Sequence, residues 1–247
     1  MTIEIIKSQL EQIKDLRILF LQDNRFQFIY NKCHENGWAE DWLIQVDSKQ
    51  AGYGAVWGSA KREDRDAVFE FYLTRPFRNS ASRIFGEFLA ASGATLIECQ
   101  SNDPLLSSML YEFTHQIHAE AILFEEDYQS RLVLPGLVFG KEPSAVNNPR
   151  DVGGYYLEKD GETVATGGFM LNYNFPYADI YMECFEAFRQ QGFGSLMVQE
   201  LKKEIYAMGR IPAARCNISN MASKATLLKA GFRVCGSVLK GVVKNTK

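Results

Sequence analysis

The sequence predicts an α/β (α+β) fold built from two halves that follow the same plan. The main observation is an extended apolar run at residues 180–185, followed by a glycine-containing turn and a helical pattern. A second observation is that the first half repeats this order of strand, turn and helix in degenerate form. The apolar residues that recur at helical spacing after the turn are Met197, Val198, Leu201, Ile205 and Met208.

The first half opens with a helical pattern from Ser8 to about Ile29. A hairpin follows, in which residues 41–46 and 51–57 flank the polar turn Asp47-Ser48-Lys49-Gln50. Ala67 to Leu73 is continuously apolar apart from one glutamate, which predicts a buried strand.

The rest of the first half continues the repeat. A helical pattern ends near Gly93, and residues 94–99 form the next predicted strand. Asn102-Asp103-Pro104 then opens another predicted helix, which runs through Leu110 and Tyr111. The open alternative is that this half is an unrelated α/β segment.

The second half begins after a polar segment, Gly140 to Arg150, which contains two prolines and two asparagines. Residues 154–158 and 163–171 form a predicted hairpin around Lys159-Asp160-Gly161, a strong turn signal. We therefore expect two domains, residues 1–135 and residues 136–247.

The turn Arg189-Gln190-Gln191-Gly192-Phe193-Gly194 is a candidate phosphate site. A strand–turn–helix junction directs backbone N–H groups and the positive end of the helix dipole at one point, and glycine permits positive φ and close approach. The turn lacks the Gly-Lys-Ser/Thr ending of a P-loop and the first glycine of the dinucleotide fingerprint. The alternative is that both glycines serve packing only.

This turn resembles the pyrophosphate loop of the GNAT N-acetyltransferase superfamily, Arg/Gln-x-x-Gly-x-Gly/Ala. About thirty residues later, the segment from Asn220 to Gly231-Phe232 resembles the last helix of that family, with an N-cap and a C-cap in suitable places. The whole chain is similar to a tandem two-domain subgroup with a degenerate N-terminal copy. The resemblance implies two GNAT-like domains, each a mixed, mostly antiparallel sheet flanked by helices.

The implied activity is acetyl-CoA-dependent transfer of acetyl to a primary amine of an unidentified small molecule or peptide. Acetyl-CoA is then the acyl donor substrate, and no metal is expected. The first half has Ala81 and Arg83 where the second half has its two glycines, so only the C-terminal domain, residues 136–247, is expected to bind acetyl-CoA.

Two carboxylates on the strand before the turn are the candidate catalytic bases. Side chains alternate along a strand, so Asp179 and Glu183 share one face. Glu183 is the first choice and Asp179 the second, and each could instead be a structural carboxylate. The candidate coenzyme-binding residues that the resemblance implies are Cys184, Phe185, Arg189, Gln190, Gln191, Gly192, Phe193, Gly194, Ser195, Asn217, Asn220 and Ser223.

One position departs from the family pattern. The last helix often carries a Tyr that reprotonates the leaving thiolate, and Leu227 stands there in this chain. Leu227 therefore favours an alternative function, a non-catalytic coenzyme A-binding regulatory or sensor protein. A third interpretation is a two-domain interaction protein that binds no ligand.

Composition limits the partners. The net charge is −3 and there is no basic block, so no nucleic acid partner is expected. No apolar run reaches membrane-spanning length, so no membrane is expected. The five cysteines are scattered without a CxxC pair, which favours a reducing, cytoplasmic location. The second half is too short to contain the helices that normally open a domain of this family. The partner subunit of a homodimer is one expected source of residues that cover the surface left by these helices.

Overall fold

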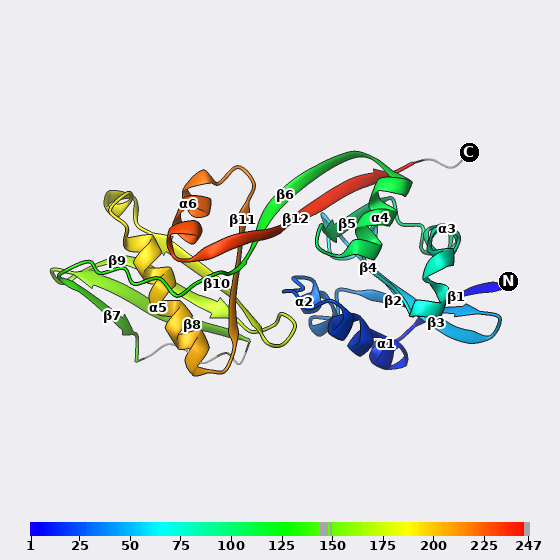
Figure 1. Cartoon of the computed structure of the whole chain (residues 1–247), viewed down its shortest axis with the longest axis horizontal. Coiled ribbons are helices and arrows are strands. Elements are labelled where there is room, and N and C mark those ends of the chain that lie inside the picture. The colour runs from blue at the N-terminus through cyan, green and yellow to red at the C-terminus, as the bar shows by residue number, and fades with distance from the viewer. Residues whose placement is uncertain (144–147, 149, 245–247) are drawn as a thin grey trace. The chain divides into compact units, whose positions relative to one another are not determined.

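The structure is a computed structural model that describes residues 1–143, 148 and 150–244. It separates into two compact units (Figure 1). Unit 1 consists of Met1–Glu120 and Ser237–Lys247, and unit 2 consists of Ala121–Gly236. Within the described part of the chain, every helix is too short or too polar to cross a membrane.

Unit 1 has a six-stranded sheet in the order β1-β2-β3-β4-β5-β12. Neighbouring strands pair antiparallel except β4 and β5, which are parallel. The elements are β1 (Ile3–Ser8), α1 (Leu10–Asp23), α2 (Asn31–Glu35), β2 (Glu40–Val46), β3 (Lys49–Trp57), β4 (Ala67–Leu73), the 3-10 helix η1 (Arg75–Ser80), α3 (Ala81–Ser92), β5 (Leu96–Gln100), α4 (Pro104–Phe113) and the C-terminal part of β12 (Phe232–Val243).

Helices cover both faces of the unit 1 sheet. Phe20 of α1 packs edge-on against Tyr72 of β4, with ring centroids 6.0 Å apart. Phe85 of α3 packs in the same way against Phe71, at 4.8 Å. Because neighbouring residues of a strand point to opposite faces, α1 and α3 lie on opposite sides of the sheet.

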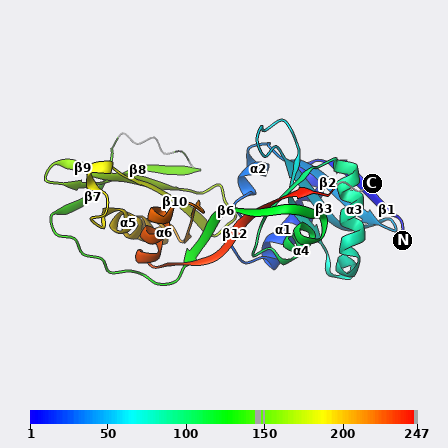
Figure 2. The same cartoon turned by 90° about the horizontal axis from the view of Figure 1, so that it is seen from above.

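In unit 2 the strands of the sheet follow the order β7-β8-β9-β10-β11-β6. Here β10 and β11 are the parallel pair. The α5 and α6 helices lie on one face of this sheet, over a core that includes Met197 and Leu201 (Figure 2). The elements are β6 (Thr114–Glu126), β7 (Leu137–Lys141), β8 (Asp151–Lys159), β9 (Glu162–Met170), β10 (Tyr177–Cys184), the 3-10 helix η2 (Glu186–Phe188), α5 (Phe193–Ala207), β11 (Ile211–Asn217) and α6 (Met221–Lys229).

Both predicted hairpins are present, and their turns have the expected geometry. Asp47 and Ser48 have φ of 47° and 63°, and Asp160 and Gly161 have φ of 52° and 82°. Two successive positive φ angles are typical of the turns that match the twist of a tight hairpin. The predicted helix from Ser8 to Ile29 is wrong at both ends, since β1 extends to Ser8 and α1 ends at Asp23.

Two strands, β6 and β12, begin in one unit and end in the other. Residues 121–125 of β6 pair with β11 in unit 2, and residues 238–242 of β12 pair with β5 in unit 1. The division therefore differs from the expected boundary between residues 135 and 136, because each sheet is completed by a strand from a distant part of the sequence. Within the polar segment 140–150, residues 144–147 and 149 lie outside the described residues.

Candidate functional site

The parallel strands β10 and β11 pair over a short stretch only. Their Cα partners are Tyr177 with Ile211, Ala178 with Pro212, and Asp179 with Ala213. Beyond this point β10 continues to Cys184 and β11 continues to Asn217, without further pairing between them among the described residues. The two strands thus separate at their carboxyl ends, which leaves an opening between their facing edges.

The backbone of Cys184 faces this opening. The N–H of Phe185 donates to the carbonyl oxygen of Val164 in β9 at 3.1 Å. Successive residues of a strand direct their N–H groups to opposite edges. The N–H of Cys184 is therefore directed to the edge next to β11, where a ligand lying between the strands would accept a hydrogen bond from it.

The turn after β10 places its two glycines for different reasons. Gly192 is the N-cap of α5 and has φ of +89°, a conformation that other residues rarely adopt. Gly194 lies in the first turn of α5, where an added Cβ would be 3.1 Å from Met182 Cε and 3.3 Å from Thr226 Cγ2. The N–H groups of this first turn have no acceptor within the helix, which makes it suited to an anion.

A cavity of about 650 Å³ joins this turn, the end of β10 and one face of α6. It brings together most of the predicted site residues, and the Arg189 and Lys229 side chains place two cations on its lining. The lining residues are Met182, Glu183, Cys184, Arg189, Gln190, Gly192, Phe193, Gly194, Ser195, Asn220, Ala222, Ser223, Ala225, Thr226 and Lys229.

Four predicted residues do not line this cavity: Asp179, Phe185, Gln191 and Asn217. Asp179 is buried, and its carboxylate lies 3.4 Å from Arg215 Nε. Asn217 accepts hydrogen bonds from the backbone N–H and the hydroxyl of Ser219, at 2.9 and 2.6 Å.

Several lining residues also hold the site together. Asn220 Oδ1 accepts from Ser223 N–H at 3.0 Å and so caps α6. Ser195 Oγ donates to the Thr226 carbonyl oxygen at 3.2 Å, which joins α5 to α6. Arg189 Nε donates to the carbonyl oxygen of Cys184 at 3.2 Å, which holds the turn against the end of β10.

The side chain of Cys184 is suited to a structural role. Burial raises the pKa of its thiol, although Arg189 and the backbone N–H of Gly194 act in the opposite direction. At neutral pH this group is therefore a thiol rather than the thiolate that a cysteine nucleophile needs.

Sequence reasoning missed Lys229 of α6 and did not assign Thr226 to the coenzyme site. Residues three apart on a helix are neighbours on its surface, and Asn220, Ser223, Thr226 and Lys229 follow this spacing. The polar repeat was therefore a signal for one helix face lining a ligand site. Leu227 is on another side of α6, in the core of unit 2, with 5% of its surface exposed.

Two family models match the chain. A model described as an acetyltransferase (GNAT) domain matches residues 9–127, and a model described as FR47-like protein matches residues 173–238. The chain belongs to the GNAT superfamily. Because the first model matches the N-terminal half, the alternative that this half is an unrelated α/β segment is wrong, and the arrangement is a tandem one.

Solved structures with the same GNAT fold cover nearly the whole chain. An acetyltransferase from the GNAT family of Colwellia psychrerythraea has a TM-score of 0.77 and 13% identity, and 99% of this chain and 100% of that chain are covered. A tandem GNAT protein from the clavulanic acid biosynthesis pathway has a TM-score of 0.66 and 9% identity, with full coverage of both chains. A GCN5-related N-acetyltransferase from Sphaerobacter thermophilus has a TM-score of 0.62 and 12% identity, with 98% and 96% covered.

At these identities the likeness shows the fold alone. A comparison with curated proteins found no significant match.

The first GNAT unit differs from the second at the equivalent turn. Ala81 occupies the place of the first glycine and is packed in the core of unit 1, and Arg83 occupies the place of the second. The parallel strands β4 and β5 also separate after two pairs, Ala67 with Leu96 and Val68 with Ile97. Unit 1 therefore retains the separated strands of the fold but not the glycine turn.

Proposed function

We propose that this chain is an acetyl-CoA-dependent N-acetyltransferase, and that unit 2 transfers acetyl to a primary amine of a small molecule or peptide. The observation that carries this proposal is the cavity at the end of β10, the N-terminus of α5 and one face of α6, with Arg189 and Lys229 on its lining. Its volume of about 650 Å³ lies in the usual range of small-molecule sites.

The donor site fits a pyrophosphate. The first-turn N–H groups of α5 supply donors, and Gly192 at the N-cap adopts the φ of +89° that this turn requires. The guanidinium of Arg189 and the ammonium of Lys229 are expected to neutralise the phosphate charge through charge-assisted hydrogen bonds.

Acetyl-CoA supplies an acetyl group activated as a thioester. The N–H of Cys184 is placed to donate a hydrogen bond to the carbonyl oxygen of that group and to stabilise the negative charge that develops during attack. Glu183 lines the cavity and is exposed, so its carboxylate is accessible to an acceptor amine. In this proposal Glu183 takes the proton of the ammonium and leaves the neutral amine as nucleophile.

One observation favours the second candidate function, a non-catalytic coenzyme A-binding sensor. Leu227 stands where the family often has its acid, and it is buried in the core rather than directed to the cavity. Of three hydroxyl-bearing residues of unit 2 that could replace this acid, Thr226 lines the cavity, whereas Tyr181 and Tyr206 do not.

Calorimetric titration of the full chain with acetyl-CoA tests the proposal. We expect one site per chain with a binding free energy of about −8 kcal/mol, which is micromolar affinity. Release of free thiol in the presence of a panel of primary amines then measures turnover. Binding without amine-dependent thiol release would support the sensor, and absence of binding would refute both functions.

A further inference from the structure

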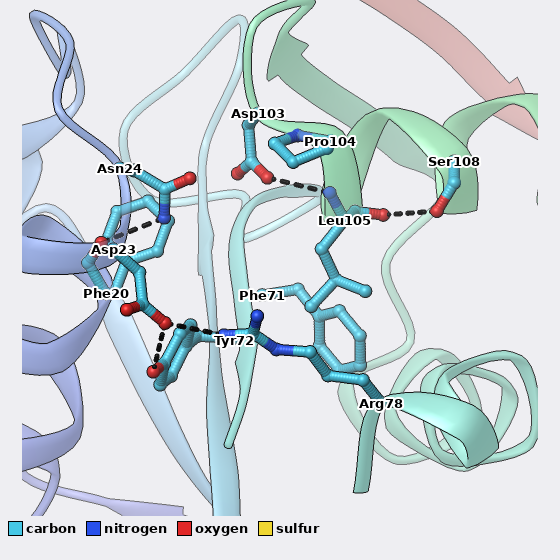
Figure 3. A pocket seen from close by; sticks show the side chains of 10 residues that line it. All are labelled: Phe20, Asp23, Asn24, Phe71, Tyr72, Arg78, Asp103, Pro104, Leu105 and Ser108. Carbon is cyan, nitrogen blue, oxygen red and sulfur yellow. Dashed lines mark hydrogen bonds and ion pairs between the residues drawn. The ribbon is translucent and has the colours of Figure 1, made fainter. Parts of the chain in front are cut away.

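Unit 1 has a pocket of its own where its parallel strands separate. Its volume is about 300 Å³, and it lies between the end of α1, the end of β4, η1 and the start of α4 (Figure 3). The end of β4, η1 and the start of α4 correspond to the end of β10, the turn after it and the start of α6 at the coenzyme cavity of unit 2, whereas α1 contributes only to the pocket of unit 1. Phe20, Phe71 and Leu105 form its apolar part, and Asp23, Arg78 and Asp103 lie on its polar part.

The cation of this pocket is already engaged. Arg78 Nη2 lies 2.6 Å from Asp23 Oδ2, and its Nε donates to the carbonyl oxygen of Leu73 at 2.9 Å. Tyr72 donates its hydroxyl to the same oxygen of Asp23 at 2.9 Å. The charge of Arg78 is therefore balanced within the pocket by Asp23.

Asp103 is the group that points to a ligand. It is 2% exposed, and its Oδ1 caps α4 by accepting from the N–H groups of Leu105 and Leu106, at 3.1 and 3.2 Å. Its Oδ2 is buried and has no hydrogen-bond partner. Figure 3 shows this second oxygen directed away from α4, toward the side of the pocket where Asn24 lies.

A buried carboxylate oxygen without a donor is costly, so it marks a place where a donor would bind favourably. Burial raises the pKa of Asp103 to about 7, against the effect of the two backbone N–H groups. A cation next to Asp103 would hold it ionised. A phosphate would meet two carboxylates here, and the only guanidinium on this lining is paired with Asp23.

The geometry points to unit 1 as a binding site for a small organic ammonium, with its charged group on Asp103 Oδ2 and its apolar body against Leu105. This site is additional to the coenzyme cavity of unit 2 and takes a ligand of opposite charge.

The test uses n-butylammonium chloride as the probe, with n-butanol and sodium butyrate as neutral and anionic controls of similar shape. The readout is the amide NMR signals of the first turns of α4 in the full chain, at mildly alkaline pH. We expect saturable shifts with butylammonium, affinity for butanol weaker by about tenfold, and no saturable shift with butyrate.

The decisive variant is Asp103→Asn, because Asn caps a helix as well as Asp and replaces the unpartnered oxygen with an NH₂ group. It should reduce butylammonium affinity by about tenfold or more. Asp47→Asn, in the hairpin turn of the same unit, is the matched control and should bind as the unmodified protein does. Equal binding by Asp103→Asn with an intact α4 spectrum would overturn the proposal. So would an absent butylammonium response in the unmodified protein, equal affinity for butanol, or displacement of these signals by coenzyme A.

Discussion

Arg78 and Arg189 stand at equivalent places in the two units, and the same backbone contact holds both. Arg78 Nε donates to the carbonyl oxygen of Leu73 at 2.9 Å, and Arg189 Nε donates to that of Cys184 at 3.2 Å. Leu73 and Cys184 each end their strand, five residues earlier. Arg78 goes on to pair with Asp23, whereas Arg189 lines the larger cavity. The same hydrogen bond to the end of a strand thus positions an arginine that forms an ion pair in unit 1 and an arginine that is a candidate phosphate contact in unit 2.

Replacing Arg189 should weaken donor binding. We expect Arg189→Ala to reduce acetyl-CoA affinity by about tenfold, since one charge-assisted contact to the pyrophosphate is lost. Isothermal calorimetry measures this change. The matched control is Arg78→Ala, which removes the equivalent side chain of unit 1 and should leave the affinity unchanged. If Arg78→Ala weakens acetyl-CoA binding as much as Arg189→Ala does, the donor site is wrongly assigned to unit 2.

The two candidate bases should separate into different roles. Glu183→Gln should lower kcat for amine acetylation by about a hundredfold or more and leave acetyl-CoA affinity nearly unchanged, because it removes proton acceptance only. Asp179→Asn removes the buried partner of Arg215 and should mainly lower stability. Steady-state kinetics and urea unfolding of both variants measure these effects. Normal turnover in Glu183→Gln with loss of turnover in a folded Asp179→Asn would transfer the role of base to Asp179.

A buried cluster makes the stability of unit 1 depend on pH. His34 Nε2 lies 2.6 Å from Glu70 Oε2, and His34 Nδ1 lies 3.2 Å from Asp41 Oδ1. Burial alone would lower the pKa of His34, but the Glu70 and Asp41 carboxylates outweigh it and raise the pKa above 6.5. Burial alone would raise the pKa of Glu70, but Arg17 and His34 outweigh it and lower the pKa below 4.5.

The signs of these shifts set the pH window. The contribution of His34 is complete below about pH 6.5 and is lost as pH rises through its raised folded pKa. The contribution of Glu70 is complete above about pH 4.5 and is lost as pH falls through its lowered folded pKa. The cluster should therefore stabilise unit 1 most between these values. All three tryptophans, Trp38, Trp42 and Trp57, are in unit 1, so their fluorescence during urea unfolding reports on this unit.

His34→Gln should lower the unfolding free energy of unit 1 by about 3 kcal/mol, since it removes the cation next to the Asp41 carboxylate and leaves Glu70 with Arg17 alone. It should also remove the loss of stability above about pH 6.5. His118→Gln is the control, because the His118 side chain is 59% exposed and lies 3.7 Å from Glu120. An unchanged pH profile in His34→Gln would show that this cluster does not set the profile.

Lys202 should be essential to the packing of α5 and α6. Its buried ammonium donates to the carbonyl oxygens of Tyr128 and Ala230, at 2.8 and 3.1 Å, and lies 3.2 Å from Glu126 Oε1. Lys202→Met should lower the stability of unit 2 by about 3 kcal/mol, because these acceptors lose their donor. Hydrogen exchange of the α6 amides measures this loss.

Lys203→Met is the neighbouring control. The Lys203 side chain is 58% exposed and pairs with Glu200 at 2.6 Å on the helix surface, so we expect a change below about 0.5 kcal/mol. Comparable exchange rates in the two variants would contradict the assigned role of Lys202.

The amino-acid sequence by itself determined the local elements and the donor turn. Strand, turn and helix around Gly192, the cap at Asn220 and the two tight hairpins depend on residues that are close in sequence, and they formed as predicted. Most of the predicted coenzyme residues line one cavity for the same reason, since a single turn and a single helix start carry them.

Only the tertiary structure decided which distant groups meet. It completed each sheet with a strand from the other part of the chain, through β6 and β12. It also paired Asp179 with Arg215, placed Lys229 on the cavity and left Asp103 Oδ2 without a donor. Strand pairing and burial arise from contacts between residues that are far apart in the chain. The local pattern of apolar residues does not determine which of these distant residues come into contact.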